Sequence, residues 1–178
     1  MISKTKSSIG ANRFYFLLWG WVAFIGIMGQ FVLKVVFGYA QHYIVWLIVL
    51  PAVVASIIRS ARDGRRQQVR TYVGENMGYL WTGMGISFFV LGFIITNMRV
   101  PQTGWLVSYP FYILLYGLGT FVSGKFLQFP PLVIGGIINW VLACVAVFFP
   151  FDYQMLFAAT AIVVSYLIPG YLIKNVNH

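Results

Sequence analysis

The chain has 178 residues, of which 60% are hydrophobic and only 8% are charged. A soluble domain carries about 25% charged residues, so this composition excludes an ordinary soluble domain and indicates a membrane protein. The net charge of +9 would suit a nucleic-acid-binding protein. The cations, however, lie beside the ends of apolar runs, where they orient a membrane protein and contact anionic lipid. We therefore expect no nucleic-acid partner.

Six apolar runs, separated by short polar gaps, predict an all-α, polytopic membrane protein with six transmembrane helices. The first run begins near Phe14 and is too long for the hydrophobic region of a signal peptide, so we expect it to be retained as the first span. Too few residues lie outside the runs for a soluble domain, and residues 1–178 should therefore form a single membrane domain. The expected spans are residues 14–36, 43–58, 76–98, 105–123, 131–149 and 153–173.

The gap after the first run contains polar groups that have two interpretations. Lys34 lies near the outer end of the first span, one turn after Gln30, and His42 opens the second span. The long side chain of Lys34 can extend to the membrane interface, which is the interpretation we favour. Alternatively, Lys34 faces an external vestibule that binds an anion.

A basic segment follows the second span, which is expected to end at Ile58. Its side chains should contact the headgroups of anionic lipids at the cytoplasmic face, or a cytoplasmic protein partner. Glu75 then opens the third span, where a carboxylate either complements the helix dipole or marks a functional site inside the membrane. The basic residues are Arg59, Arg62, Arg65, Arg66 and Arg70.

Three uncharged polar side chains in the later spans could line a polar cavity together with Glu75. Tyr112 and Tyr116 follow Pro110 in the fourth span, and broken helices beside aromatic residues form substrate pockets in some transporters. Asn139 lies in the fifth span. A buried amide can either hold two helices together or contact a ligand, and we favour the first role.

The cations are distributed unequally between the two ends of the predicted helices. Of the twelve lysines and arginines, Lys34 and Arg99 lie in gaps on one side, which leaves ten on the side of the N-terminus (12 − 2). Cytoplasmic loops of membrane proteins carry the excess of Lys and Arg. The sequence therefore predicts a multi-pass protein of the bacterial inner membrane with its N- and C-termini in the cytoplasm.

Tryptophans occupy similar places in the first, third and fifth spans. Trp19, Trp81 and Trp140 are separated by 62 and 59 residues (81 − 19 and 140 − 81). This spacing is compatible with a threefold internal repeat, in which the six spans form three parallel helical hairpins. Alternatively, it reflects only the preference of tryptophan for membrane interfaces.

Four apolar motifs carry a resemblance to known proteins. They are Leu-Leu-Trp-Gly-Trp at residues 17–21, Tyr-Gly-Leu-Gly-Thr-Phe at 116–121, Gly-Gly-Ile-Ile-Asn-Trp at 135–140 and Ser-Tyr-Leu-Ile-Pro-Gly-Tyr-Leu at 165–172. With these motifs the chain resembles a group of small six-helix bacterial inner-membrane proteins of unassigned function. The likeness covers most of the chain and implies the six-span topology, but it implies no catalytic residue.

The residue types in the spans argue against an enzyme or a cofactor-binding protein. A single cysteine, Cys144, allows neither an intramolecular disulfide nor a cysteine metal cluster, and neither histidine lies deep in a span, which disfavours haem. We therefore expect no enzymatic activity and no cofactor. Two functions remain: a non-enzymatic membrane scaffold or signalling partner, and a small transporter or channel for a neutral or weakly anionic solute. We favour the scaffold because coupled transporters usually need buried charges, and the sequence leaves a homo-oligomer or a protein partner open.

Overall fold

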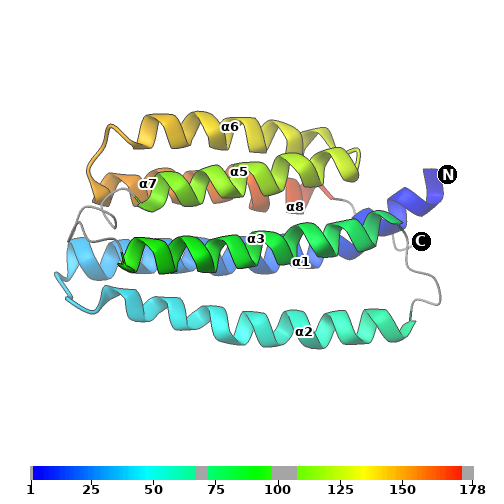
Figure 1. Ribbon diagram of the computed structural model, residues 1–178, viewed down its shortest axis with the longest axis horizontal. Coiled ribbons are helices and arrows are strands. Elements are labelled where there is room, and N and C mark those ends of the chain that lie inside the picture. The colour runs from blue at the N-terminus through cyan, green and yellow to red at the C-terminus, as the bar shows by residue number, and fades with distance from the viewer. Residues whose placement is uncertain (1, 67–71, 98–107, 174–178) are drawn as a thin grey trace.

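The computed structural model describes residues 2–66, 72–97 and 108–173, and the side chains of residues 13–62, 74–97 and 108–173. Within these ranges the chain is helical between short turns and has no strand, which confirms the predicted all-α class. The helical segments lie side by side along one axis and alternate in direction (Figure 1). They are α1 (Ile2–Phe31) with the π-helical η1 (Val32–Val36), the 3-10 helix η2 (His42–Ile48) with α2 (Val49–Arg66), α3 (Tyr72–Asn97), α5 (Ser108–Phe126), α6 (Pro130–Ala146), and α7 (Phe151–Ile162) with the π-helical η3 (Val163–Leu167) and α8 (Ile168–Leu172).

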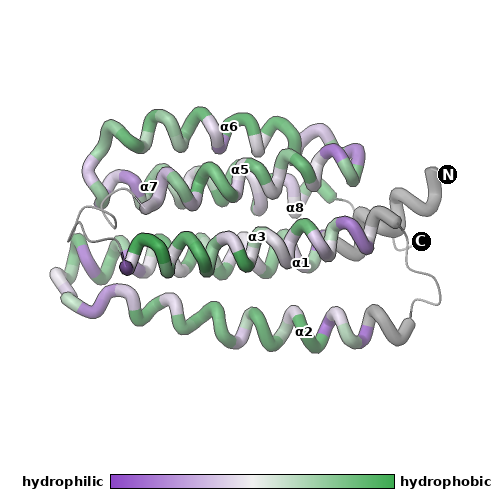
Figure 2. The backbone as a smooth tube through the Cα atoms, viewed as in Figure 1, coloured by the Kyte–Doolittle hydropathy of each residue, from purple (hydrophilic) through white to green (hydrophobic). Residues whose placement is uncertain are grey.

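Four of the described segments are long and apolar enough to cross a membrane. These are Arg13–Val36, His42–Arg62, Gly74–Asn97 and Phe151–Leu172. The helix α6 is apolar but has 17 residues, and α5, with 19 residues, contains three tyrosines that lower its hydropathy. Hydrophobic residues nevertheless cover most of the length of each helix (Figure 2). Each predicted span overlaps one helical segment, and a crossing of the membrane by all six stays a prediction.

The two ends of the bundle hold different parts of the chain (Figure 1). The terminal end, as we name it, holds the first turns of α1, the turn between α5 and α6, and the last turn of α8. The distal end holds the turn from η1 to η2, the turn from α6 to α7, and the first turn of α5. The alternating directions therefore bring η1, η2, α5 and α7 together at the distal end, although they lie far apart in the sequence.

The core lies between α1, α3, α5, α6 and α7, whereas α2 runs along the edge of the bundle and packs against α1 (Figure 1). Ala52 is the one buried side chain among the described residues of α2. Large apolar side chains cover the outward faces, and Phe89 and Phe148 are 77% and 86% exposed. Such a surface is unfavourable in water and favourable in a lipid bilayer. Buried core residues include Phe16, Met77, Ile113, Leu132, Met155 and Ile162.

Glycines bring the backbones of α5 and α6 into close contact. A Cβ atom added to Gly136 would lie 2.7 Å from the carbonyl oxygen of Gly117, and one added to Gly124 would lie 2.6 Å from the amide nitrogen of Val133. The pairs that three hairpins would form, α3 with α5 and α6 with α7, are also in contact, but α5 and α6 pack against each other most extensively because small residues let their backbones approach closely. The threefold repeat stays a prediction.

Candidate functional site

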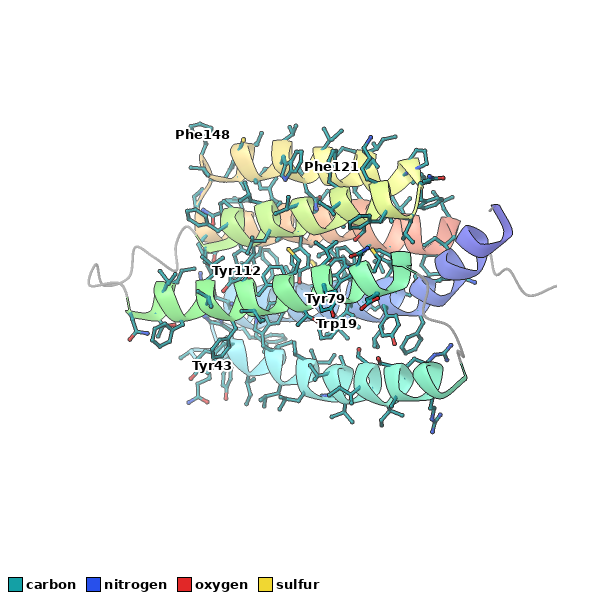
Figure 3. The ribbon with its side chains drawn as sticks, turned by 45° about the vertical axis from the view of Figure 1, so that its right-hand side comes forward. Trp19, Tyr43, Tyr79, Tyr112, Phe121 and Phe148 are labelled. Atoms are coloured by element: carbon teal, nitrogen blue, oxygen red, sulfur yellow. The ribbon has the colours of Figure 1, made fainter. Side chains whose placement is uncertain are left out.

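The residues predicted to line a polar cavity lie in different surroundings. Glu75 is exposed in the first turn of α3, where its carboxylate complements the helix dipole. Tyr112 of α5 lies on the side of α5 that faces α3 (Figure 3). Its ring is 5.9 Å from that of Phe88 on α3. Tyr116 packs against the same Phe88 at 4.7 Å and meets the ring of Tyr166 edge-on at 5.4 Å. Because Phe88 and Glu75 are 13 residues apart on α3 (88 − 75), Glu75 lies about 20 Å along the helix from the place where both tyrosines pack.

Asn139 is fully buried between α6 and η3. Its Nδ2 donates a hydrogen bond to the Oγ of Ser165 at 3.1 Å, and the Ser165 hydroxyl donates to the carbonyl oxygen of Ala161 at 2.6 Å. The Asn139 amide therefore links two helices, as in the role that we favoured from the sequence. The Oδ1 of Asn139 has no hydrogen-bond partner among the described residues, and neither has the buried hydroxyl of Tyr166.

An apolar groove of about 330 Å³ lies between α3 and α5. Ser87 contributes its one hydroxyl group, which already donates to the carbonyl oxygen of Gly83 at 2.9 Å. None of the four residues predicted for a polar cavity lines this groove. Its surface suits a lipid chain better than a polar solute. The lining includes Ile86, Val90, Leu91, Ile94, Phe111 and Leu114.

The basic segment predicted to follow the second span is partly helical. The helix α2 continues to Arg66, eight residues beyond Ile58 (66 − 58), since alanine and arginine favour helix and the charged turns can leave the apolar layer. Arg59 and Arg62 are exposed there, and the Arg59 guanidinium lies 5.1 Å from the ring centre of Phe14. The other predicted cations are Arg65 and Arg66, in the last turn of α2, and Arg70, which lies outside the described residues.

The charged side chains divide unequally between the two ends of the bundle. Among the described side chains, four cations and the single carboxylate of Glu75 lie at the terminal end. The described cation at the distal end, Lys34 in η1, forms an ion pair with Asp152 in the first turn of α7. Within the described side chains, the formal charge is therefore +3 at the terminal end (4 − 1) and zero at the distal end (1 − 1). The four cations are Arg13, Arg59, Arg62 and Lys125.

The ion pair changes the interpretation of Lys34. Its ammonium group also lies 4.4 Å from the ring centre of Phe151, and the side chains of Lys34 and Asp152 are 32% and 44% exposed. The two interpretations made from the sequence, a lysine that extends to the membrane interface and a vestibule that binds an anion, did not involve Asp152. Because Asp152 balances the charge of Lys34, an anion gains little from approaching it.

A hydrogen-bonded group of four side chains, which we call the distal cluster, adjoins this ion pair. Gln30, in the last turn of α1, is only 6% exposed. Its Oε1 accepts hydrogen bonds from the indole Nε1 of Trp46 at 2.6 Å and from the hydroxyl of Tyr109 at 2.9 Å. Its Nε2 lies 3.1 Å from the Nδ1 of His42. The Tyr109 ring in turn packs at 5.3 Å against Phe151, the residue next to Asp152.

Sequence reasoning found half of this arrangement. It placed Gln30, Lys34 and His42 near one another but missed Trp46 in η2, Tyr109 in α5 and Asp152 in α7. The sequence did contain a signal for Tyr109 and Asp152. Each lies in the first turn of its helix, and the alternating topology places the start of that helix at the same end of the bundle as Lys34. The topology therefore could have suggested the neighbourhood, although not the individual contacts.

Comparison with known proteins adds no relative. No family of proteins, no curated protein and no solved structure matches the chain. The resemblance to small six-helix bacterial inner-membrane proteins thus stays a prediction. Function must be argued from the geometry and charge of the chain itself.

Proposed function

We propose that the chain is a six-span protein of the bacterial inner membrane with cytoplasmic termini, and that it acts as a non-enzymatic scaffold or signalling partner. The observation that carries this proposal is the unequal charge of the two ends. Four described cations lie at the terminal end with one carboxylate, whereas Lys34 at the distal end is balanced by Asp152. The difference between the ends is three positive charges whether cations alone are counted (4 − 1) or the carboxylates are included (3 − 0), and the end of a membrane protein with the excess of Lys and Arg faces the cytoplasm.

The use of polar groups along the helices supports a structural role. Hydroxyl groups along α3 and α5 donate to carbonyl oxygens of their own helix: Thr96 to Gly92 at 2.8 Å, and Ser123 to Gly119 at 2.7 Å. Asn139 bonds across to Ser165. The hydroxyl donors are thus satisfied within their own helices and the Asn139 amide joins two helices, so none of these donors is free to bind a solute.

The exposed arginines of α2 are the proposed contact with anionic headgroups. The test uses the full chain in detergent and compares binding of phosphatidylglycerol with binding of phosphatidylcholine by native mass spectrometry. Each arginine near the surface contributes about 1 kcal/mol, so the double variant Arg59→Gln/Arg62→Gln should bind phosphatidylglycerol more than tenfold more weakly. Lys34→Gln, at the other end, is the matched control and should bind as the wild type does. Equal binding of the two lipids by the wild type would contradict the proposal.

A transporter or channel is the second candidate, and one observation favours it. The Oδ1 of Asn139 and the hydroxyl of Tyr166 are buried without hydrogen-bond partners among the described residues, and a solute path could hydrate such atoms. The test places one cysteine at the site, as Asn139→Cys in a Cys144→Ala background, and treats membranes with a small charged thiol reagent. Labelling of the cysteine would support a hydrated path, whereas protection would support the scaffold.

A further inference from the structure

The orientation of the Gln30 amide is fixed by a partner that can only donate. The indole nitrogen of Trp46 carries a hydrogen and has no acceptor capacity, so the atom that faces it at 2.6 Å must be the amide oxygen. The hydroxyl of Tyr109, at 2.9 Å from the same oxygen, can donate or accept and therefore does not fix the orientation by itself. Trp46 thus determines that the Nε2 of Gln30 points to His42.

This orientation fixes the protonation state of His42. The amide nitrogen of Gln30 can only donate, so the Nδ1 of His42, at 3.1 Å, must accept the hydrogen bond. The imidazole is then neutral, with its proton on Nε2. A protonated ring carries hydrogens on both nitrogens and would place one donor against another. Protonation of His42 therefore breaks its bond to Gln30, and the amide cannot turn over to restore it without losing Trp46.

The charged neighbours of His42 do not supply a substitute. Among the described residues, the charged groups that interact with the ring are Lys34 from η1 and Asp152 from α7, and these two form an ion pair with each other. The titratable phenol of Tyr109, from α5, is engaged by Gln30, and Tyr43 lies edge-on beside the ring at 6.1 Å. The described part of α2, which continues η2, has its first cation at Arg59, 17 residues from His42 (59 − 42).

Besides the bond from Gln30 to His42, η2 is attached to α1 by the hydrogen bond from Trp46 to Gln30 and by packing on two glycines. A Cβ atom added to Gly26 would lie 3.2 Å from the Trp46 ring, and one added to Gly29 would lie 2.9 Å from Val45, so η2 rests on two glycines of α1. The 3-10 helix has poorer hydrogen-bond geometry than the α-helix, and α2 beyond it is almost wholly exposed. Local opening is favoured where packing is this sparse.

We propose that the distal cluster is a proton-sensing clasp, in which neutral His42 holds η2 against α1 and protonation of His42 releases it. The hydrogen bond to the neutral ring disfavours the charged form, so His42 should bind a proton only below the ordinary imidazole pKa of about 6.5. The clasp is therefore closed at neutral pH and opens on acidification. This inference depends on the distal cluster alone and stands apart from the scaffold and transporter proposals.

The first test determines the tautomer of His42. The chain has two histidines, so His178→Gln leaves His42 as a single reporter without changing the distal cluster. Nitrogen-15 NMR of the histidine-labelled protein in nanodiscs should give an unprotonated Nδ1 and a protonated Nε2 at pH 8. A proton on Nδ1 at pH 8 would overturn the proposal.

The second test separates the two donors to Gln30. In Trp46→Phe the amide is free to turn, because the Tyr109 hydroxyl can accept from Nε2, and the Gln30 oxygen can then accept from protonated His42. The pH midpoint of the His42 titration should rise by about one unit or more, a tenfold change in proton affinity. Tyr109→Phe leaves Trp46 in place and should shift the midpoint by less than about half a unit. Equal shifts in both variants would overturn the role of Trp46.

The third test measures the release itself in the otherwise unchanged His178→Gln protein. Hydrogen exchange of residues 42–48 is followed by mass spectrometry across the His42 titration and corrected for the intrinsic pH dependence of amide exchange, with α6 as the internal reference. Protection of residues 42–48 should fall at least tenfold as His42 is protonated, while that of α6 stays constant. Unchanged protection of residues 42–48 would show that no clasp opens and would overturn the proposal.

Discussion

The close contact of α5 and α6 predicts opposite effects for the same substitution at two glycines. In Gly136→Ala the added methyl group would lie 2.7 Å from the carbonyl oxygen of Gly117 and 2.8 Å from the amide nitrogen of Phe121, so a backbone must move. Overpacking of this kind costs about 1–3 kcal/mol. At Gly85, in the middle of α3, no atom lies within 4 Å of the added methyl group, and Gly85→Ala should gain up to about 1 kcal/mol from helix propensity alone.

The difference between the two variants isolates the packing cost. Both substitutions add the same methyl group and the same gain in helix propensity, so the propensity cancels and about 1–3 kcal/mol should remain. The assay is reversible unfolding of the purified protein in mixed micelles, with increasing fractions of a denaturing detergent. Gly136→Ala should unfold at a lower fraction than the wild type, and Gly85→Ala at the same or a higher one. A Gly136→Ala protein as stable as Gly85→Ala would refute the close packing of α5 and α6.

Two further predictions concern bonds between helices, and both can be measured in the same unfolding assay. Ser165→Ala leaves both polar atoms of the buried Asn139 amide without partners and should cost about 1–3 kcal/mol of stability. Asn139→Leu should cost less, because the Ser165 hydroxyl keeps its bond to Ala161. The reverse order would mean that the Asn139 amide has partners other than Ser165. For the partly exposed pair of Lys34 and Asp152, a double-mutant cycle of Lys34→Met and Asp152→Asn should give a coupling energy of about 0.2–1 kcal/mol. This coupling energy should decrease as salt is added. A coupling energy of zero at low salt would mean that the pair does not form.

The helices themselves were predictable because long apolar runs are a strong signal. Each expected span overlaps a helical segment, but the helix ends differ from the expected ones. The apolar part of the second span stops near Ile58, whereas its helix continues to Arg66, since hydropathy reports where lipid surrounds the chain and not where backbone hydrogen bonds end. The partners of each helix were not predictable, because close approach depends on which glycine faces which backbone.

The contacts of the candidate site were less accessible to sequence reasoning for a physical reason. Lys34 and Asp152 are separated by 118 residues, and Gln30 and Tyr109 by 79 residues. An isolated lysine near a helix end has a sufficient local explanation in its long side chain, so nothing in its neighbourhood calls for a carboxylate. Similarly, the amide of Asn139 was recognised as a helix link, but its partner Ser165 follows only from the packing of η3 on α6.

The central claim is that the bundle crosses the membrane with its terminal end in the cytoplasm. Two exposed glutamines in turns at opposite ends, Gln41 and Gln128, provide a matched pair of positions for single cysteines in a Cys144→Ala background. The measurement is labelling of intact bacterial cells with a membrane-impermeant maleimide, before and after permeabilisation. The account predicts that Gln41→Cys reacts in intact cells and that Gln128→Cys reacts only after permeabilisation. Labelling of Gln128→Cys in intact cells would contradict it.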